Sequence, residues 1–134
     1  MTKIVAYWVL TVLIAVETLV GGVTDLIHGR TLLLYGPPVV DIVTHLGYPV
    51  YFLGIIGVWK LLGGVTLLVP GYPRLKEWAY AGIVFELSGA VVSWFACEHN
   101  VRDAIAPMLL AFLALGSWAL QPQSCFLRVR ATRE

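Results

Sequence analysis

The sequence predicts an all-α integral membrane protein, a four-helix bundle with a short interfacial helix in the first loop. Of the 134 residues, 59% are hydrophobic and 13% are charged, whereas soluble domains carry roughly 25% charged residues. Four apolar stretches come close to the ~20 residues that a membrane-spanning helix needs. These stretches are expected to be helical because lipid cannot satisfy exposed backbone groups.

The composition excludes a soluble globular domain, a disordered tail, a nucleic-acid binder and a disulfide-stapled secreted module. The net charge of +1 offers no strong field for acidic partners. Residues 1–134 are predicted to form a single transmembrane domain. Cys97 and Cys125 are expected on opposite membrane faces, which argues against a disulfide.

Four spans are predicted over residues 4–28, 51–69, 78–96 and 104–120, followed by a cytoplasmic tail of residues 121–134. The first is expected to be an uncleaved span, because its apolar stretch is longer than a usual signal peptide and contains Glu17. Gly36-Pro37-Pro38, Pro70-Gly71-Tyr72-Pro73 and Gln121-Pro122 mark breaks between or after spans. Residues 39–46 form the predicted interfacial helix, in which Asp41 could orient the His45 ring.

The distribution of basic residues predicts that both termini are cytoplasmic. Six basic residues fall on the side of the termini and the second loop, namely Lys3, Arg74, Lys76, Arg128, Arg130 and Arg133. Two basic residues, Arg30 and Arg102, fall on the other side.

Three ionisable residues inside spans are the candidate catalytic residues: Glu17, Lys60 and Glu86. Counted at the helical rise, their depths nearly coincide, and buried charges normally face the bundle interior and pair. We predict a Glu17–Lys60 pair with Glu86 close by. Two carboxylates and one ammonium leave one excess negative charge, so one carboxyl is expected to hold a proton for a redox partner or a transported proton. The alternative is a structural ion pair that fixes helix register.

A polar funnel is predicted between the outer surface and these carboxyls. Glu17, Gly21, Asp25 and His28 share a helical stripe, as do Glu86, Ala90, Ser93 and Cys97. The candidate ligand-binding residues are Asp25, His28, Asp41, His45, Trp59, Cys97 and His99. Solvated or structural roles are the alternative. Imidazole and carboxylate also suit divalent metals, but no compact ligand motif such as HxxxH or CxxC occurs, so no metal site is assigned.

Glycines at helical spacing are expected to permit close helix contact and to turn Lys60 and Glu86 toward protein. They are Gly54, Gly57 and Gly64 in the second span and Gly82 and Gly89 in the third.

Several short motifs are similar to those of the DoxX-like family of small bacterial membrane proteins. They are Leu46-Gly47-Tyr48-Pro49, Trp59-Lys60-Leu61-Leu62-Gly63, Pro70, Lys76-Glu77-Trp78-Ala79-Tyr80-Ala81-Gly82 and Phe85-Glu86-Leu87-Ser88-Gly89-Ala90. The resemblance covers most of the chain. It implies a four-helix bundle in the bacterial inner (cytoplasmic) membrane. Because the family's founding member is a subunit of a thiosulfate:quinone oxidoreductase, it also implies a quinone as the candidate cofactor.

Three functions follow as hypotheses. The first is a component of a quinone-linked membrane oxidoreductase with a polar site in the bundle. The second is a non-enzymatic accessory or assembly subunit of a larger membrane complex, and the third is a small-solute or proton-coupled carrier. No haem, flavin or iron–sulfur motif is recognisable, so the chain alone is not expected to carry electrons. The expected partners are the lipid bilayer and a partner membrane subunit or homo-oligomer, without nucleic acid.

Overall fold

The computed structural model describes residues 1–30, 37–98 and 101–122, and these residues form a helical bundle. Its helices are α1 (Thr2–Leu26), α2 (Val39–His45), α3 (Tyr51–Leu68), α4 (Pro73–Glu98) and α5 (Val101–Ala119). All except α2 are long and apolar enough to cross a membrane. The predicted fold class, a four-helix membrane bundle with a short helix in the first loop, is confirmed.

Two predicted helix starts are too late, because polar residues belong to the first turns. α4 begins at Pro73 rather than at residue 78, and α5 begins at Val101 rather than at residue 104. Proline is well suited to a first helical position, since its φ is already helical and that position needs no intrahelical N–H bond. Hydropathy therefore locates the apolar centre of each span, whereas the helices extend beyond it.

The first helix ends two residues earlier than predicted. His28 has a φ of 54°, and the Gly29 N–H donates to the Thr24 carbonyl oxygen at 2.9 Å. A left-handed residue followed by such a bond is a common way to end a helix. The chain turns there, and the Val39 N–H donates to the Gly29 carbonyl oxygen at 3.0 Å, which holds the start of α2 beside the end of α1.

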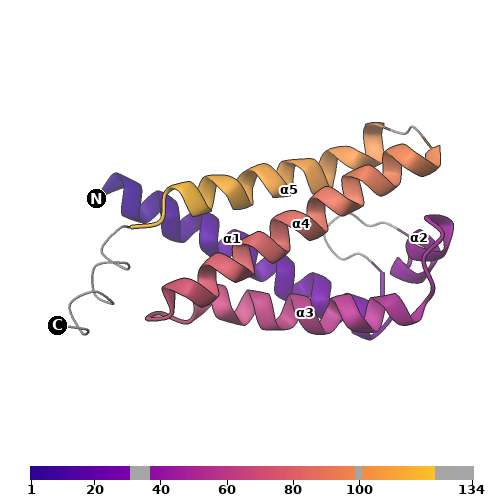
Figure 1. The fold of residues 1–134 in the computed structure, drawn as a ribbon, viewed down its shortest axis with the longest axis horizontal. Helices are drawn as coiled ribbons and strands as arrows, with labels where there is room; N and C mark the ends of the chain where they lie inside the picture. The colour runs from indigo at the N-terminus through magenta and orange to yellow at the C-terminus, as the bar shows by residue number, and fades with distance from the viewer. Residues whose placement is uncertain (31–36, 99–100, 123–134) are drawn as a thin grey trace.

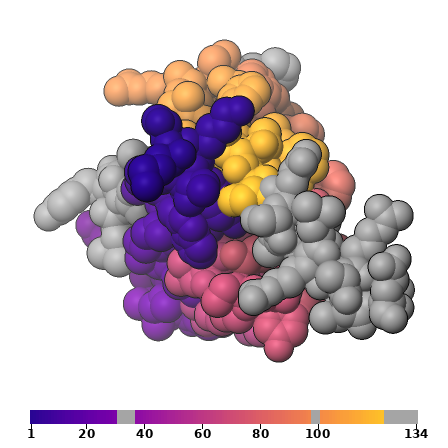
Figure 2. Space-filling model, turned by 90° about the vertical axis from the view of Figure 1, so that its left-hand side faces the viewer, coloured from indigo at the N-terminus to yellow at the C-terminus, as the bar shows by residue number. Residues whose placement is uncertain are grey.

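The four long helices form a ring in which α1 and α4 each pack against both α3 and α5 (Figure 1). The start of α1, the turn at residues 69–72 and the end of α5 lie together, at what we call the turn end. The opposite end, which carries α2, is the α2 end. Seen from the turn end, the first turns of α1 lie against the last turns of α5 (Figure 2).

The buried core lies in the half of the bundle nearer the turn end. It is made of Ile14, Ala15, Leu67, Tyr80, Ile83 and Ala114. Three buried hydroxyls next to it form a closed ring, with Thr11 Oγ1 at 2.9 Å from Ser117 Oγ, Tyr80 OH at 2.8 Å from Ser117 Oγ, and Thr11 Oγ1 at 3.1 Å from Tyr80 OH. Since a hydroxyl both donates and accepts, the ring lets each member donate one bond and accept one.

The glycines divide into two groups. Those facing the α1–α3 contact are tightly enclosed: a Cβ on Gly57 would lie 2.8 Å from Leu26 Cγ, and one on Gly64 would lie 2.7 Å from Leu19 Cγ. A Cβ on Gly54, Gly82 or Gly89 would meet nothing within 4 Å. The expectation of close helix contact is therefore right for Gly57 and Gly64 and wrong for the other three. Gly82 and Gly89 face cavities between α3 and α4, and Gly54 faces open space.

Candidate functional site

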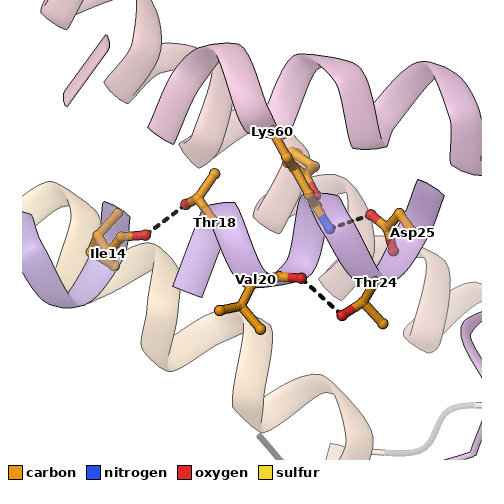
Figure 3. A network of polar contacts seen from close by, with 7 residues as sticks. Ile14, Thr18, Val20, Thr24, Asp25 and Lys60 are labelled. Carbon is orange, nitrogen blue, oxygen red and sulfur yellow. Dashed lines mark hydrogen bonds and ion pairs between the residues drawn. The ribbon is translucent and has the colours of Figure 1, made fainter. Parts of the chain in front are cut away.

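Lys60 is the centre of a charged cluster that joins three helices. Its Nζ donates to Asp25 Oδ2 of α1 at 2.8 Å (Figure 3) and lies 3.0 Å from Glu86 Oε1 of α4. Only 8% of the Asp25 side chain, 20% of Lys60 and 27% of Glu86 are exposed. Lys60 is the tenth of the 18 residues of α3, so the cluster lies near the middle of this span.

Gly22 on α1 lets α3 approach closely enough for Lys60 to reach Asp25. A Cβ on Gly22 would lie only 2.9 Å from Lys60 Cβ, so a larger residue there would push α3 away. Thr18 and Thr24 flank this stretch of α1, and their hydroxyls donate to the carbonyl oxygens of Ile14 and Val20 (Figure 3). These hydroxyl protons are therefore used within α1.

The ion-pair partner on α1 is Asp25, in place of the predicted Glu17. Helical side chains lean toward the N-terminus of their own helix. α3 starts at the α2 end, so Lys60 leans toward Asp25, whereas Glu17 leans toward the turn end. Glu17 still borders the cluster: a Cβ on Gly21 would lie 3.6 Å from Lys60 Nζ and 3.9 Å from Glu17 Oε1.

A cavity of about 410 Å³ extends from this cluster to α2. We call it the first cavity. Its polar end consists of Asp25, Lys60 and Glu86. The rest of its wall is largely apolar and comes from α2, the turn after α2, α3 and α4. It consists of Val39, Ile42, Val43, Leu46, Phe52, Leu53, Ile56, Phe85, Gly89, Ala90 and Trp94, together with Tyr48 and Ser93. Phe85 is 74% exposed, so the cavity reaches the outer surface of the bundle between α3 and α4.

Short contacts attach the α2 segment to α4 over this cavity. Ser93 Oγ donates to the Gly89 carbonyl oxygen at 2.8 Å, and Tyr48 OH lies 2.8 Å from Ser93 Oγ. The Tyr48 hydroxyl is therefore the donor of that bond. Cys97 Sγ donates to the Leu46 carbonyl oxygen at 3.6 Å, so the turn that follows α2 has a second contact with α4.

A second cavity, of about 400 Å³, lies beyond the Lys60–Glu86 pair in the direction of the turn end. Ile56, Lys60 and Glu86 line both cavities. The other residues of the second cavity are Trp59, Leu62, Gly63 and Thr66 of α3 and Leu75, Trp78, Ala79, Gly82 and Ile83 of α4. The Lys60–Glu86 pair thus divides the groove between α3 and α4 into two compartments.

The structure gathers only part of the predicted funnel. Asp25 and the stripe of Glu86, Ala90 and Ser93 line the first cavity, and Trp59 lines the second. His28, Asp41, His45 and Cys97 are exposed and line neither cavity, and His99 lies outside the described residues.

His28 leaves the predicted stripe because it adopts the left-handed conformation that ends α1. Asp41 and His45 lie on the exposed face of α2, whose apolar face covers the first cavity. Tyr48 and Phe52 were missed as cavity residues, although Tyr48 belongs to the Leu46-Gly47-Tyr48-Pro49 motif. Among the residues that the structure describes, no three His, Cys, Asp or Glu side chains gather in a metal-binding arrangement.

Comparison with known proteins agrees with the motifs read from the sequence. The model of the DoxX-like family matches residues 9–117, which include all four long helices in large part and every residue of the charged cluster. The comparisons with curated proteins and with solved structures found no match. The chain belongs to the DoxX-like family, as a membrane protein with four apolar helices.

Proposed function

We propose that this protein is a component of a quinone-linked membrane oxidoreductase and that the first cavity binds the quinone head group. The observation that carries the proposal is the amphipathic character of this cavity. Its volume of about 410 Å³ lies within the range of small-molecule sites, and its apolar and aromatic walls end at the Asp25–Lys60–Glu86 cluster. A quinone has the same division, with a flat apolar ring and polar oxygens.

Each charged residue has a distinct role in this proposal. Lys60 and Glu86 contact the head-group oxygens and exchange protons with them, as groups at the boundary of both cavities. Asp25 holds the Lys60 ammonium in place through the 2.8 Å bond. Glu17, which borders Lys60 across Gly21, serves as a nearby proton-holding group. The exposed residues His28, Asp41, His45 and Cys97 have no part in it.

The route of entry also suits a lipid-soluble ligand. The cavity reaches the surface beside the exposed Phe85, on the flank of two membrane-spanning helices. A quinone dissolved in the bilayer would enter there without crossing water. The electron-carrying groups belong, in this proposal, to a partner subunit.

Binding of a short-chain quinone to the purified protein in detergent tests the proposal. We expect saturable binding that weakens at least tenfold in Lys60→Met, which removes the ammonium donor, and that changes in affinity in Glu86→Gln, which alters the polar end of the cavity. Glu77→Gln is the matched control, because Glu77 lies on the same helix, accepts from Trp118 Nε1 at 2.8 Å and lines neither cavity. Absence of saturable binding, or equal affinity in all four proteins, would contradict the proposal.

The second cavity supports a second candidate function, that of an accessory subunit whose groove receives a transmembrane helix of a partner subunit. Gly63 and Gly82 line this groove with open space in front of them, and small residues let helices approach closely in membranes. Trp59 and Trp78, 69% and 75% exposed, flank it.

Copurification from native membranes tests this second candidate. We expect a partner subunit at fixed stoichiometry with the wild type and its loss with Gly82→Leu, which fills the groove. Gly54→Leu is the control, because Gly54 also faces open space but lines neither cavity. A chain that runs alone in several mild detergents would argue against this function.

For the location we propose the bacterial inner membrane, with the turn end in the cytoplasm. Lys3, Arg74 and Lys76 lie at the turn end, whereas Arg30 and Arg102 lie at the α2 end. Basic residues favour the cytoplasmic side. Both termini are then cytoplasmic, and the first cavity belongs to the outer half of the membrane.

A further inference from the structure

We infer that the first cavity binds the reduced hydroquinone more tightly than the oxidised quinone, because its polar end is rich in hydrogen-bond acceptors and poor in donors. This inference rests on the proposed function and adds to it which redox form of the ligand the site prefers.

The charged cluster has more acceptors than donors. A lysine ammonium has three donors, and an ionised carboxylate only accepts. Two of the three Lys60 protons face Asp25 Oδ2 and Glu86 Oε1. One Lys60 proton therefore remains as a donor for a ligand. The second oxygen of Asp25 and the second oxygen of Glu86 remain as acceptors.

The hydroxyls on the wall add acceptors rather than donors. The Ser93 proton is used in the bond to the Gly89 carbonyl oxygen, and the Tyr48 proton is used in the bond to Ser93 Oγ. Both oxygens keep lone pairs. The Trp94 indole N–H is a further donor on the wall, but that ring lies beside the His45 imidazole, 6.4 Å between centroids, on the α2 side of the cavity.

The two redox forms of the ligand differ in whether their oxygens can donate hydrogen bonds to this wall. A hydroquinone has two O–H donors, which can satisfy the free carboxylate oxygens of Asp25 and Glu86. A quinone has only carbonyl acceptors, so it would leave these oxygens buried without partners, which is costly.

The experiment measures, without oxygen, the binding of a short-chain benzoquinone and of its hydroquinone to the same purified protein. We expect the hydroquinone to bind at least tenfold more tightly. For a two-electron couple, that ratio raises the midpoint potential of the bound probe by about 30 mV. Dodecylammonium is the third ligand, because it also donates hydrogen bonds but carries a positive charge.

Glu86→Gln tests the cause of the preference. The amide keeps an oxygen for Lys60 and replaces an acceptor with an N–H₂ donor, so the ratio of the two affinities should fall toward one. Asp25→Asn is the second variant for the same purpose, and Glu77→Gln should keep the wild-type ratio.

Three outcomes are distinguishable. Equal or tighter binding of the quinone by the wild type would overturn the inference and leave the proposed function standing. Binding of neither form would overturn the proposed function itself. If dodecylammonium alone binds, the cluster selects cations, and both the preference for hydroquinone and the proposed function are rejected.

Discussion

Gly22 and Gly57 present bare backbone to each other across the α1–α3 contact. A Cβ on Gly22 would lie 3.0 Å from the Gly57 carbonyl oxygen, and one on Gly57 would lie 2.9 Å from the Gly22 carbonyl oxygen. This close approach also sets the position of Lys60, whose Cβ packs over Gly22. The charged cluster therefore depends on two residues that carry no charge.

Gly57→Ala should destabilise the bundle, because the added methyl meets backbone and Leu26 side-chain atoms that cannot all move away. Overpacking of this kind costs about 1–3 kcal/mol. Gly82→Ala is the control and should be neutral or stabilising, since nothing lies within 4 Å of its Cβ. Thermal unfolding in detergent measures both. Equal effects of the two substitutions would contradict the packing described for α1 and α3.

Lys60→Met should cost more, because it leaves Asp25 and Glu86 buried without their cation. Removing one partner of a buried ion pair costs about 3–5 kcal/mol. Adding Asp25→Asn to Lys60→Met should restore part of that loss, since the more buried carboxylate is then removed. Denaturation of Lys60→Met, Asp25→Asn, the double variant and the wild type measures the coupling. A Lys60→Met protein as stable as the wild type would show that the pairing contributes nothing.

His28→Gly should stabilise the protein, because the left-handed φ of 54° at this position costs a non-glycine residue roughly 1–2 kcal/mol. His28→Val should have the opposite effect, since a β-branched residue tolerates this conformation poorly. Quinone affinity should be the same in both variants, because His28 lies outside the two cavities. Loss of binding in folded His28→Gly would instead give the imidazole a role in the site.

Thr11→Val should break the ring of buried hydroxyls. Valine is close in shape to threonine, but Tyr80 and Ser117 each lose a hydrogen-bond partner. Leaving buried polar groups unsatisfied costs about 1–3 kcal/mol. Thr66→Val is the control, since the Thr66 hydroxyl only donates to the Leu62 carbonyl oxygen of its own helix. If both substitutions lower the unfolding temperature equally, the ring makes no specific contribution.

The orientation proposed for the bundle predicts which side of the membrane Cys97 faces. The sequence contains two cysteines, so Cys125→Ser leaves Cys97, which is exposed at the α2 end. A membrane-impermeant maleimide should label it from the periplasmic side of spheroplasts without permeabilisation. Labelling only after permeabilisation would contradict the proposed orientation and place the α2 end in the cytoplasm.

Hydropathy was sufficient to predict the number of spans and the centre of each, because an apolar stretch is a property of the sequence alone. It was not sufficient for the cluster. Depth along the membrane places Glu17, Lys60 and Glu86 at one level, but the pairing with Asp25 depends on the direction in which each helical side chain leans. Likewise, glycine spacing does not distinguish the closed α1–α3 contact at Gly57 from the open groove at Gly82.

The outer histidines show a different limit of sequence interpretation. Grouping them on one side of the membrane brought His28 and His45 into one predicted funnel. In the structure, the turn at His28 and the apolar face of α2 place both side chains outside the cavities. A shared membrane side restricts only the position of a residue along the membrane normal. Its position in the plane of the membrane is set by tertiary packing.

The core cluster and the first cavity have no residue in common. Substitutions on the exposed apolar part of the cavity wall, such as Phe85, can therefore accumulate without touching the core cluster near the turn end. Such a division lets ligand choice diverge while the scaffold is inherited unchanged. It also marks the α2 half of the molecule as the region in which to redesign selectivity, with the turn half kept as a fixed base.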